Sequence, residues 1–161
     1  MRITIVMNRF VLTTMCYIQK DNQTLLLHRI KKEDDINQGK WIGVGGKLEK
    51  GEFPEECLKR EIFEETGLTV KDIHLHGFVV FPSLYHGEDE GMFVYSCKYF
   101  QGNIKECDEG VLQWIDNDKI NHLPMWEGDY HFFDWLKDDK FHNAKIVYEN
   151  DKIVEYKEES Y

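Results

Sequence analysis

The segment from Gly45 to Leu68, GGKLEKGEFPEECLKREIFEETGL, constrains the fold and chemistry of this chain more than any other part of it. Its second half predicts a helix on which Glu61, Glu64 and Glu65 lie at i, i+3 and i+4 and so share one face. Like charges at this spacing repel each other by about 0.2–0.5 kcal/mol per pair on an exposed helix. Because Mg²⁺ and Ca²⁺ prefer oxygen ligands, the cluster indicates a site for a hard divalent cation.

The same segment carries the start and stop signals of that helix. Pro54 suits the first helical turn, where its missing N–H group costs nothing, and Gly67 suits the position after the last turn. Leu58 and Ile62 lie four residues apart and form an apolar stripe. We therefore expect a helix from Pro54 to about Thr66, packed on one face and acidic on the other.

Length and charge limit the possible partners. The chain has 161 residues, 42% of them hydrophobic, which suits a single globular domain spanning residues 1–161. The net charge of −10 disfavours a nucleic acid polymer as partner, because neutralising its phosphates requires a basic surface. A small phosphorylated ligand remains compatible, since a bound divalent cation reverses the local sign of the field.

The sequence favours a cytoplasmic protein. It has no run of 18 apolar residues that would predict a membrane span, and residues 1–10 lack the long apolar core and cleavage site of a signal peptide. Its four cysteines show no CxxC spacing, so we expect buried reduced thiols and not disulfides or a zinc site. They are Cys16, Cys57, Cys97 and Cys107.

Strand and helix patterns are interleaved along the chain. Besides the helix at 54–66, residues 129–136 are aromatic-rich and predict a second helix. Strand patterns cover residues 11–19, 24–30, 69–81, 92–100, 111–115, 145–149 and 152–156, the last two as a hairpin. This order predicts an α/β (α+β) fold with a mixed β-sheet sandwiched between helices, α/β/α.

One histidine pair allows two interpretations. His74 and His76 lie two apart in a strand pattern and would share one face, where they could bind a metal ion. The alternative is that they form the solvent face of a strand, and the sequence favours that interpretation.

Nine constrained positions over residues 46–68 match the Nudix signature, G-x5-E-x7-R-E-U-x-E-E-x-G-U, with U an aliphatic residue. They are Gly46, Glu52, Arg60, Glu61, Ile62, Glu64, Glu65, Gly67 and Leu68. Residues 41–47, 125–129 and 140–142 also resemble the MutT and MutX type of nucleotide-sanitising Nudix hydrolase. The resemblance covers nearly the whole chain and implies the Nudix fold, with the signature forming a loop–helix–loop.

The resemblance implies a divalent metal site and a role for each matched residue. Glu61, Glu64 and Glu65 would hold Mg²⁺ or Mn²⁺, joined by the carbonyl group of Gly46. Arg60 would orient a catalytic glutamate, and it also lies four residues before Glu64, with which it can pair.

Further positions would complete the phosphate end of the site. Glu109 matches a position that supplies another metal ligand or the general base in relatives, and Glu61 is the other candidate for the base. Glu52 would support the loop and reach the metal through water. Lys47 follows the glycine pair and suits a phosphate group.

The base pocket is expected around Ile42, Trp126 and Asp129. Trp126 would stack on the base or belong to the core, and Asp129 would hydrogen-bond the purine edge. Related mammalian hydrolases have an asparagine in place of Ile42, so any recognition of an 8-oxo group here must use other donors. Three further aromatic residues line the pocket or belong to the core: Phe81, Tyr85 and Phe93.

The resemblance therefore implies a Mg²⁺-dependent hydrolase that cleaves oxidised purine deoxynucleoside triphosphates, such as 8-oxo-dGTP, to the monophosphate and pyrophosphate. The alternatives are a Nudix hydrolase of another nucleoside diphosphate derivative, or a nucleotide-binding sensor without hydrolysis. We expect a small-molecule nucleotide as the only class of substrate, no membrane partner, and a monomer or a homodimer.

Overall fold

The computed structural model describes residues 2–3 and 9–161. The expectation for the first ten residues therefore falls largely outside the described part of the chain. The strands are β1 Phe10–Lys20, β2 Gln23–His28, β3 Trp41–Ile42, β4 Val44–Lys47, β5 Thr69–Lys71, β6 His74–Tyr85, β7 Glu88–Cys97, β8 Tyr99–Gln101, β9 Val111–Asp116, β10 His142–Glu149 and β11 Lys152–Ser160. The helices are α1 Pro54–Thr66, α2 Glu127–Trp135 and the 3₁₀ helix η1 Asn117–His122.

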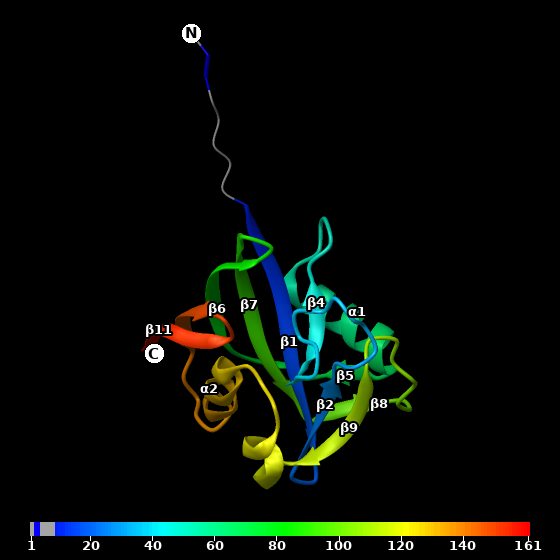
Figure 1. Ribbon diagram of the computed structural model, residues 1–161. Coiled ribbons are helices and arrows are strands. Elements are labelled where there is room, and N and C mark those ends of the chain that lie inside the picture. Colours follow the sequence, from blue (N-terminus) through cyan, green and yellow to red (C-terminus); the bar gives the residue numbers. More distant parts are fainter. Residues whose placement is uncertain (1, 4–8) are drawn as a thin grey trace.

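β1 organises a mixed nine-stranded sheet, which runs in the order β11-β10-β6-β7-β1-β2-β3 (Figure 1). It pairs in parallel with β7 on one side. On its other side the middle residues 13–16 pair antiparallel with β4 and the last three residues pair with β2, which in turn pairs with β9. β1 therefore lies between the glycine-rich strand β4 and β7, which are far apart in sequence.

Alternate residues of β1 belong to two separate apolar clusters. Met15 and Tyr17 pack with α2 residues, whereas Cys16 and Ile18 pack with α1 residues. Successive side chains of a strand point to opposite faces, so α1 and α2 cover opposite faces of the sheet. The predicted mixed sheet between helices is confirmed, with one α-helix on each face. No helix in the described part of the chain has the length and apolar character needed to cross a membrane.

The signals at the ends of α1 act as predicted. Pro54 occupies the first turn, and the Glu56 side chain accepts a hydrogen bond from the N–H group of Phe53 at 3.2 Å. Gly67 ends the helix with a φ of 81°, and its N–H group donates to the Phe63 carbonyl. Glycine adopts this left-handed backbone conformation without steric strain, because it has no Cβ atom.

Two of the predicted strands are each divided in two. Residues 69–81 form β5 and the start of β6, and residues 92–100 form the end of β7 and most of β8. Asp72, with a φ of 52°, turns the chain between β5 and β6. β5 and β8 pair with each other in a separate two-stranded sheet. The apolar pattern continued across both breaks, so it did not reveal the change of sheet.

The four cysteines are buried and free, as expected from their spacing. Cys16 lies in β1, Cys57 in α1 and Cys97 in β7. Burial raises the pKa of all three thiols, which keeps them protonated near neutral pH.

Replacing Ile62 by alanine should lower the free energy of unfolding by about 2–5 kcal/mol, because Ile62 is fully buried between α1 and the sheet. Its neighbour Phe63 is 56% exposed, so Phe63→Ala should change stability by no more than about 0.5 kcal/mol. Urea denaturation followed by circular dichroism measures both values. Equal costs for the two variants would contradict this packing.

Candidate functional site

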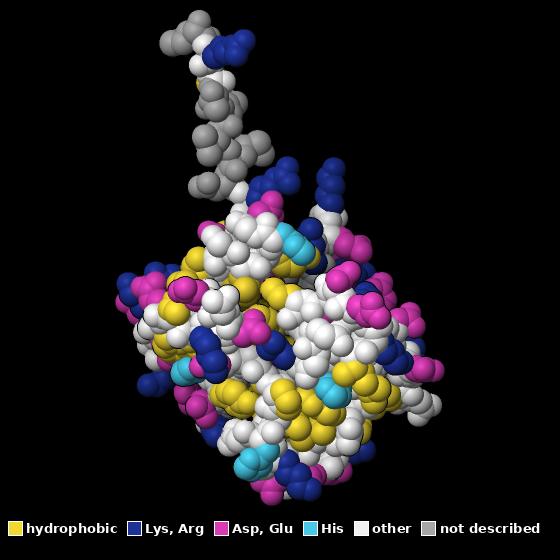
Figure 2. Space-filling view, viewed as in Figure 1, with side chains coloured by type: hydrophobic (Ala, Val, Ile, Leu, Met, Phe, Trp, Pro, Cys, Tyr) yellow, Lys and Arg dark blue, Asp and Glu magenta, His cyan; other side chains and the backbone are white. Residues whose placement is uncertain are grey.

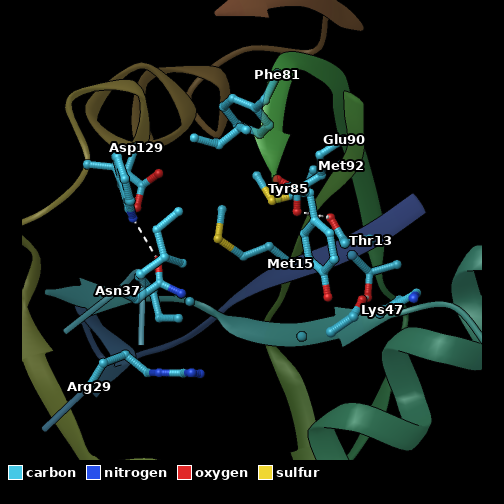
Figure 3. Close-up of a pocket in the computed structure, with 18 of the residues that line it drawn as sticks. Thr13, Met15, Arg29, Asn37, Lys47, Phe81, Tyr85, Glu90, Met92 and Asp129 are labelled. Atoms are coloured by element: carbon cyan, nitrogen blue, oxygen red, sulfur yellow. Dashed lines mark hydrogen bonds between the residues drawn. The ribbon is translucent and has the colours of Figure 1, made fainter. Parts of the chain in front are cut away.

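A cavity of about 350 Å³ opens over β1 and is lined from many parts of the chain (Figure 3). β4 and α1 contribute one side, β6 and β7 another, and the start of α2 with β10 a third. On the face shown in Figure 2, acidic and basic side chains are interspersed. The residues that line the cavity include Thr13, Met15, Arg29, Asn37, Ile42, Gly46, Lys47, Glu61, Glu65, Phe81, Tyr85, Glu90, Glu109, Trp126, Asp129 and Tyr148.

The glycine pair of β4 lets α1 approach the sheet closely. A Cβ atom on Gly46 would lie 2.7 Å from both carboxylate oxygens of Glu61, and one on Gly45 would overlap the backbone of Thr14. The Gly46 carbonyl accepts weak hydrogen bonds from Thr14 Oγ1 at 3.4 Å and Cys57 Sγ at 3.5 Å. Any larger residue would push the Glu61 carboxylate away from this backbone.

Arg60 gathers the carboxylates of the loop and the helix. Its guanidinium donates to both oxygens of Glu52, at 2.7 and 2.8 Å, and this pairing lowers the pKa of Glu52 to about 2. It also donates to Glu61 at 2.8 Å and to Glu64 at 3.2 Å. The predicted Arg60–Glu64 pair is present, and Arg60 contacts the candidate catalytic residue Glu61.

Glu65 lies at the centre of the buried acidic group. Burial raises the pKa of its carboxyl group to about 8, and the negative charges of Glu109 and Glu61 add to the rise. Its Oε2 atom is buried without a hydrogen-bond partner. A buried carboxylate oxygen that no donor satisfies carries a large desolvation penalty, which a cation would remove.

Glu109 reaches the same cavity from the loop before β9. Arg29 donates to Glu109 at 2.6 Å and also to Asp35 at 2.6 Å, and Lys32 Nζ lies 3.3 Å from the other carboxylate oxygen of Glu109.

Glu61 lines the same cavity from α1. Burial raises the pKa of its carboxyl group, although the charge of Arg60 opposes the rise. The structure therefore places Glu61, Glu65 and Glu109 around one space.

The donor set fits a hard divalent cation, because it consists of carboxylate and carbonyl oxygens with one buried oxygen left unsatisfied. Within residues 2–3 and 9–161, no three acidic, histidine or cysteine side chains already converge as metal ligands. Arg60 contacts one oxygen of Glu61, and Arg29 contacts one of Glu109. Glu64 is 55% exposed and does not line the cavity, unlike Glu61 and Glu65.

Trp126 and Asp129 form the other end of the cavity, with Ile42 nearby in the lining. The Trp126 side chain is buried at 8% exposure, and its indole N–H group donates to Asn37 Oδ1 at 2.7 Å. The two interpretations of Trp126 are therefore compatible, since it is buried and still lines the cavity. Lys40 Nζ lies 4.5 Å from the centre of its ring.

Asp129 is buried at 5% exposure, and its Oδ2 atom has no hydrogen-bond partner in the described part of the chain. Burial raises the pKa of this carboxyl group to about 8, so it holds a proton at neutral pH. A protonated carboxyl group donates as well as accepts. This end of the cavity can therefore present a hydrogen-bond donor to a ligand.

Among the three aromatic residues expected near the pocket, Phe81 and Tyr85 line it. Phe93 does not, because it packs against the cluster beneath α1 on the other face of the sheet. Lys47 Nζ lies 5.8 Å from the Tyr85 ring centre, at the side of the cavity near Gly46.

Sequence reasoning missed several residues that line the cavity. Arg29 and Asn37 lie between β2 and β3, where the sequence shows no functional motif, and Tyr148 lies in the last hairpin. Thr13 and Glu90 lie in strands, where Thr13 Oγ1 donates to Glu90 Oε1 at 3.0 Å. No local motif marks them, because only the pairing of distant strands brings them to the cavity.

The histidine pair has a mixed outcome. His74 is exposed, as predicted for a strand facing solvent, but His76 is buried and its Nε2 atom lies 2.6 Å from Ser96 Oγ. Burial lowers the pKa of His76 to about 4, which keeps it neutral. The prediction that both rings face solvent is therefore wrong for His76, because the register of β6 against β7 shifts between Leu75 and Gly77 and the ring lies against Ser96 of β7.

Comparison with known proteins identifies the family. A model of the NUDIX domain matches residues 9–136. The chain belongs to the Nudix family. An oxidized purine nucleoside triphosphate hydrolase of Danio rerio is 34% identical to this Nudix hydrolase over 127 residues, covering 78% of this chain and 81% of the relative. The uncharacterized Nudix hydrolase YvcI of Bacillus subtilis (strain 168) is also 34% identical over 127 residues, covering 76% and 77%.

The fold is that of solved MutT structures. The crystal structure of a mutator MutT protein from Bacillus halodurans superposes with a TM-score of 0.80 at 30% identity, covering 92% of this chain and 97% of that chain. The Nudix fold implied by the signature is thus confirmed. Nudix hydrolases generally use a divalent metal ion, which agrees with the oxygen donors around Glu65.

Replacing Asp129 by asparagine should change how the stability of this Nudix hydrolase depends on pH. The folded-state pKa of about 8 exceeds the ordinary value of 3.8, so the folded state retains a proton that the unfolded state loses between about pH 4 and pH 8. Over that window, the stability of the wild type relative to Asp129→Asn should fall as pH rises, by up to about 1.4 kcal/mol per pH unit.

Urea denaturation at a series of pH values measures this difference. Asp134→Asn is the matched control, because Asp134 lies on the same helix but is exposed. Parallel profiles for the wild type and Asp129→Asn would show that Asp129 does not bind the proton.

Proposed function

We propose that this Nudix hydrolase is a Mg²⁺- or Mn²⁺-dependent diphosphatase of oxidised purine deoxynucleoside triphosphates, chiefly 8-oxo-dGTP. One observation carries the proposal, namely that a single cavity has two different ends. Glu61 and Glu65 form an acidic end that suits a metal ion, and Trp126 and Asp129 form an aromatic end with a hydrogen-bond donor. The relatives named oxidized purine nucleoside triphosphate hydrolase, in Danio rerio and Mus musculus, support this substrate class. The substrate would be a small-molecule nucleotide, handled in the cytoplasm by a monomer or homodimer.

At the phosphate end, Glu61, Glu64, Glu65 and the carbonyl group of Gly46 would hold the cation. When bound, the cation polarises phosphate oxygens and lowers the pKa of water. Arg60 would keep the Glu61 carboxylate oriented through its 2.8 Å contact. The Glu61 carboxylate lies against the Gly46 backbone, since a Cβ atom at Gly46 would be 2.7 Å from both of its oxygens.

The reaction is substitution at an internal phosphorus atom. The oxygen of water forms a new bond to that phosphorus, the bond to the departing pyrophosphate breaks, and the proton of water passes to a carboxylate. Glu109 or Glu61 would accept this proton, since both lie at the cavity. Lys47 would neutralise charge on the phosphate chain from the side of β4.

At the base end, Trp126 would form a wall against the purine ring, and the protonated Asp129 would donate to its polar edge. Ile42 offers only apolar contact, so Asp129 and neighbours such as Asn37 would have to make the hydrogen bonds to the base. The Asn37 amide oxygen accepts from Trp126, while its NH₂ group remains able to donate.

Glu65→Gln and Glu64→Gln should each reduce turnover by more than about 100-fold while the protein stays folded, since even the outer partners of metal ligands contribute roughly 10–100-fold. Mg²⁺ should raise the melting temperature of the wild type but not that of Glu65→Gln, because ligands stabilise only the state that binds them. Glu56→Gln is the control, as glutamine can also cap α1 at this position. Full activity of either variant at saturating Mg²⁺ would refute its role as a ligand.

A substrate panel tests the nucleotide. We expect kcat/KM for 8-oxo-dGTP to exceed that for dGTP by at least about tenfold, the effect of one added hydrogen bond. Phosphate release with added inorganic pyrophosphatase reports turnover of these two and of dUTP. Diadenosine polyphosphates and ADP-ribose release no pyrophosphate, so their turnover is followed by phosphate release with added alkaline phosphatase, which attacks the products but not the intact substrates. Equal values for 8-oxo-dGTP and dGTP would reject the proposed selectivity. A preference for a dinucleoside polyphosphate or nucleotide sugar would favour another Nudix substrate class, and binding without turnover would favour a sensor.

A further inference from the structure

Glu90 is a carboxylate in the cavity that the proposed chemistry does not use. It lies on β7, where its backbone pairs with Val11 of β1 and Phe81 of β6. Its Oε1 atom accepts the hydrogen bond from Thr13 Oγ1 at 3.0 Å, and burial raises its pKa. In the described part of the chain, no lysine or arginine forms an ion pair with Glu90. The cavity thus contains a hydrogen-bond acceptor with no cation beside it.

Glu90 lies on the side of the cavity opposite Asp129, next to the Lys47 edge of the phosphate end. Figure 3 shows Glu90 and Thr13 close to Tyr85 and Lys47 on one side, with Asp129 on the opposite side. Strand register fixes this side relative to the phosphate end, because Thr13 pairs with Lys47 and the next residue of β1 pairs with Gly46.

Three groups of a nucleotide extend from its sugar ring in different directions. The base leaves from C1′, the phosphate chain from C5′, and the hydroxyl edge points away from both. With the base at Trp126 and Asp129 and the phosphates at Glu65, the hydroxyl edge would be left to face Glu90 and Thr13, which lie across the cavity from Asp129. A carboxylate repels phosphate but accepts a strong hydrogen bond from a hydroxyl group.

We propose that Glu90, positioned by Thr13, accepts a hydrogen bond from the 3′-hydroxyl group of the bound nucleotide. This inference rests on the proposed function, because it assumes a nucleotide in this cavity. It adds a specificity: the site selects nucleotides whose 3′-hydroxyl is free. A 3′-phosphate or 3′-ester would lose the donor, and a phosphate would also place a negative charge against Glu90.

The test compares two ligands that differ only in this hydroxyl group. Isothermal titration calorimetry gives the dissociation constants of dGMP and 2′,3′-dideoxyguanosine monophosphate, and kcat/KM is measured for the two triphosphates. The wild type should prefer the 3′-hydroxyl ligand by about tenfold in both measurements. Glu90→Met, which removes the acceptor, should bring the ratio close to one.

Glu88→Gln is the matched control and should keep the wild-type preference, because Glu88 lies on the same strand, outside the cavity lining, beside Arg9. Thermal melting checks folding. If Glu90→Met does not fold, Thr13→Val removes only the positioning hydrogen bond and should still lower the preference.

The outcomes separate the two proposals. If the wild type turns over dGTP but does not distinguish the dideoxy ligand, or if Glu90→Met weakens both ligands equally, the inference about Glu90 is wrong and the proposed function stands. If the wild type neither binds nor hydrolyses any nucleotide, the proposed function is wrong and the inference falls with it.

Discussion

The paired hydrogen bonds from Arg60 to Glu52, at 2.7 and 2.8 Å, hold the acidic site in shape. Without the positive charge of Arg60 among them, the carboxylates of the loop and of α1 would repel one another and separate. The same guanidinium reaches Glu61, which lies against the bare backbone of Gly46. Arg60 does not reach the buried Oε2 atom of Glu65, which has no partner. That unsatisfied buried oxygen makes the site suited to a divalent cation and not to a closed network of salt bridges.

The position of this site follows from the two faces of β1. One face supports α1 and its carboxylates, and the other supports the apolar cluster under α2. The cavity lies over β1, between β4 on one side and β7 on the other. Residues of both α1 and α2 therefore line it. In the proposed function, α1 would supply the phosphate end, and α2 with β7 would supply the residues that contact base and sugar.

The sequence predicted the local parts of this arrangement well. The limits of α1 follow from Pro54 and Gly67, and the turn at Asn150 and Asp151 has the positive φ angles expected of a tight hairpin. It did not predict where β5 separates from β6, because the apolar pattern is the same on both sides of the break. Backbone conformation at one residue and the identity of the pairing strand decide that division.

By itself the sequence determined the family, the reaction class and the carboxylates of α1, because all of these depend on residues close together in one helix and its flanking glycines. Only the tertiary structure decided which of those groups face the cavity. It buries Glu65 and leaves Glu64 near solvent, and it gives Asp129 a pKa of about 8. Arg29 and Glu90 also enter the site only through folding. Burial and charge pairing are properties of the packed environment, so residues distant in sequence set them.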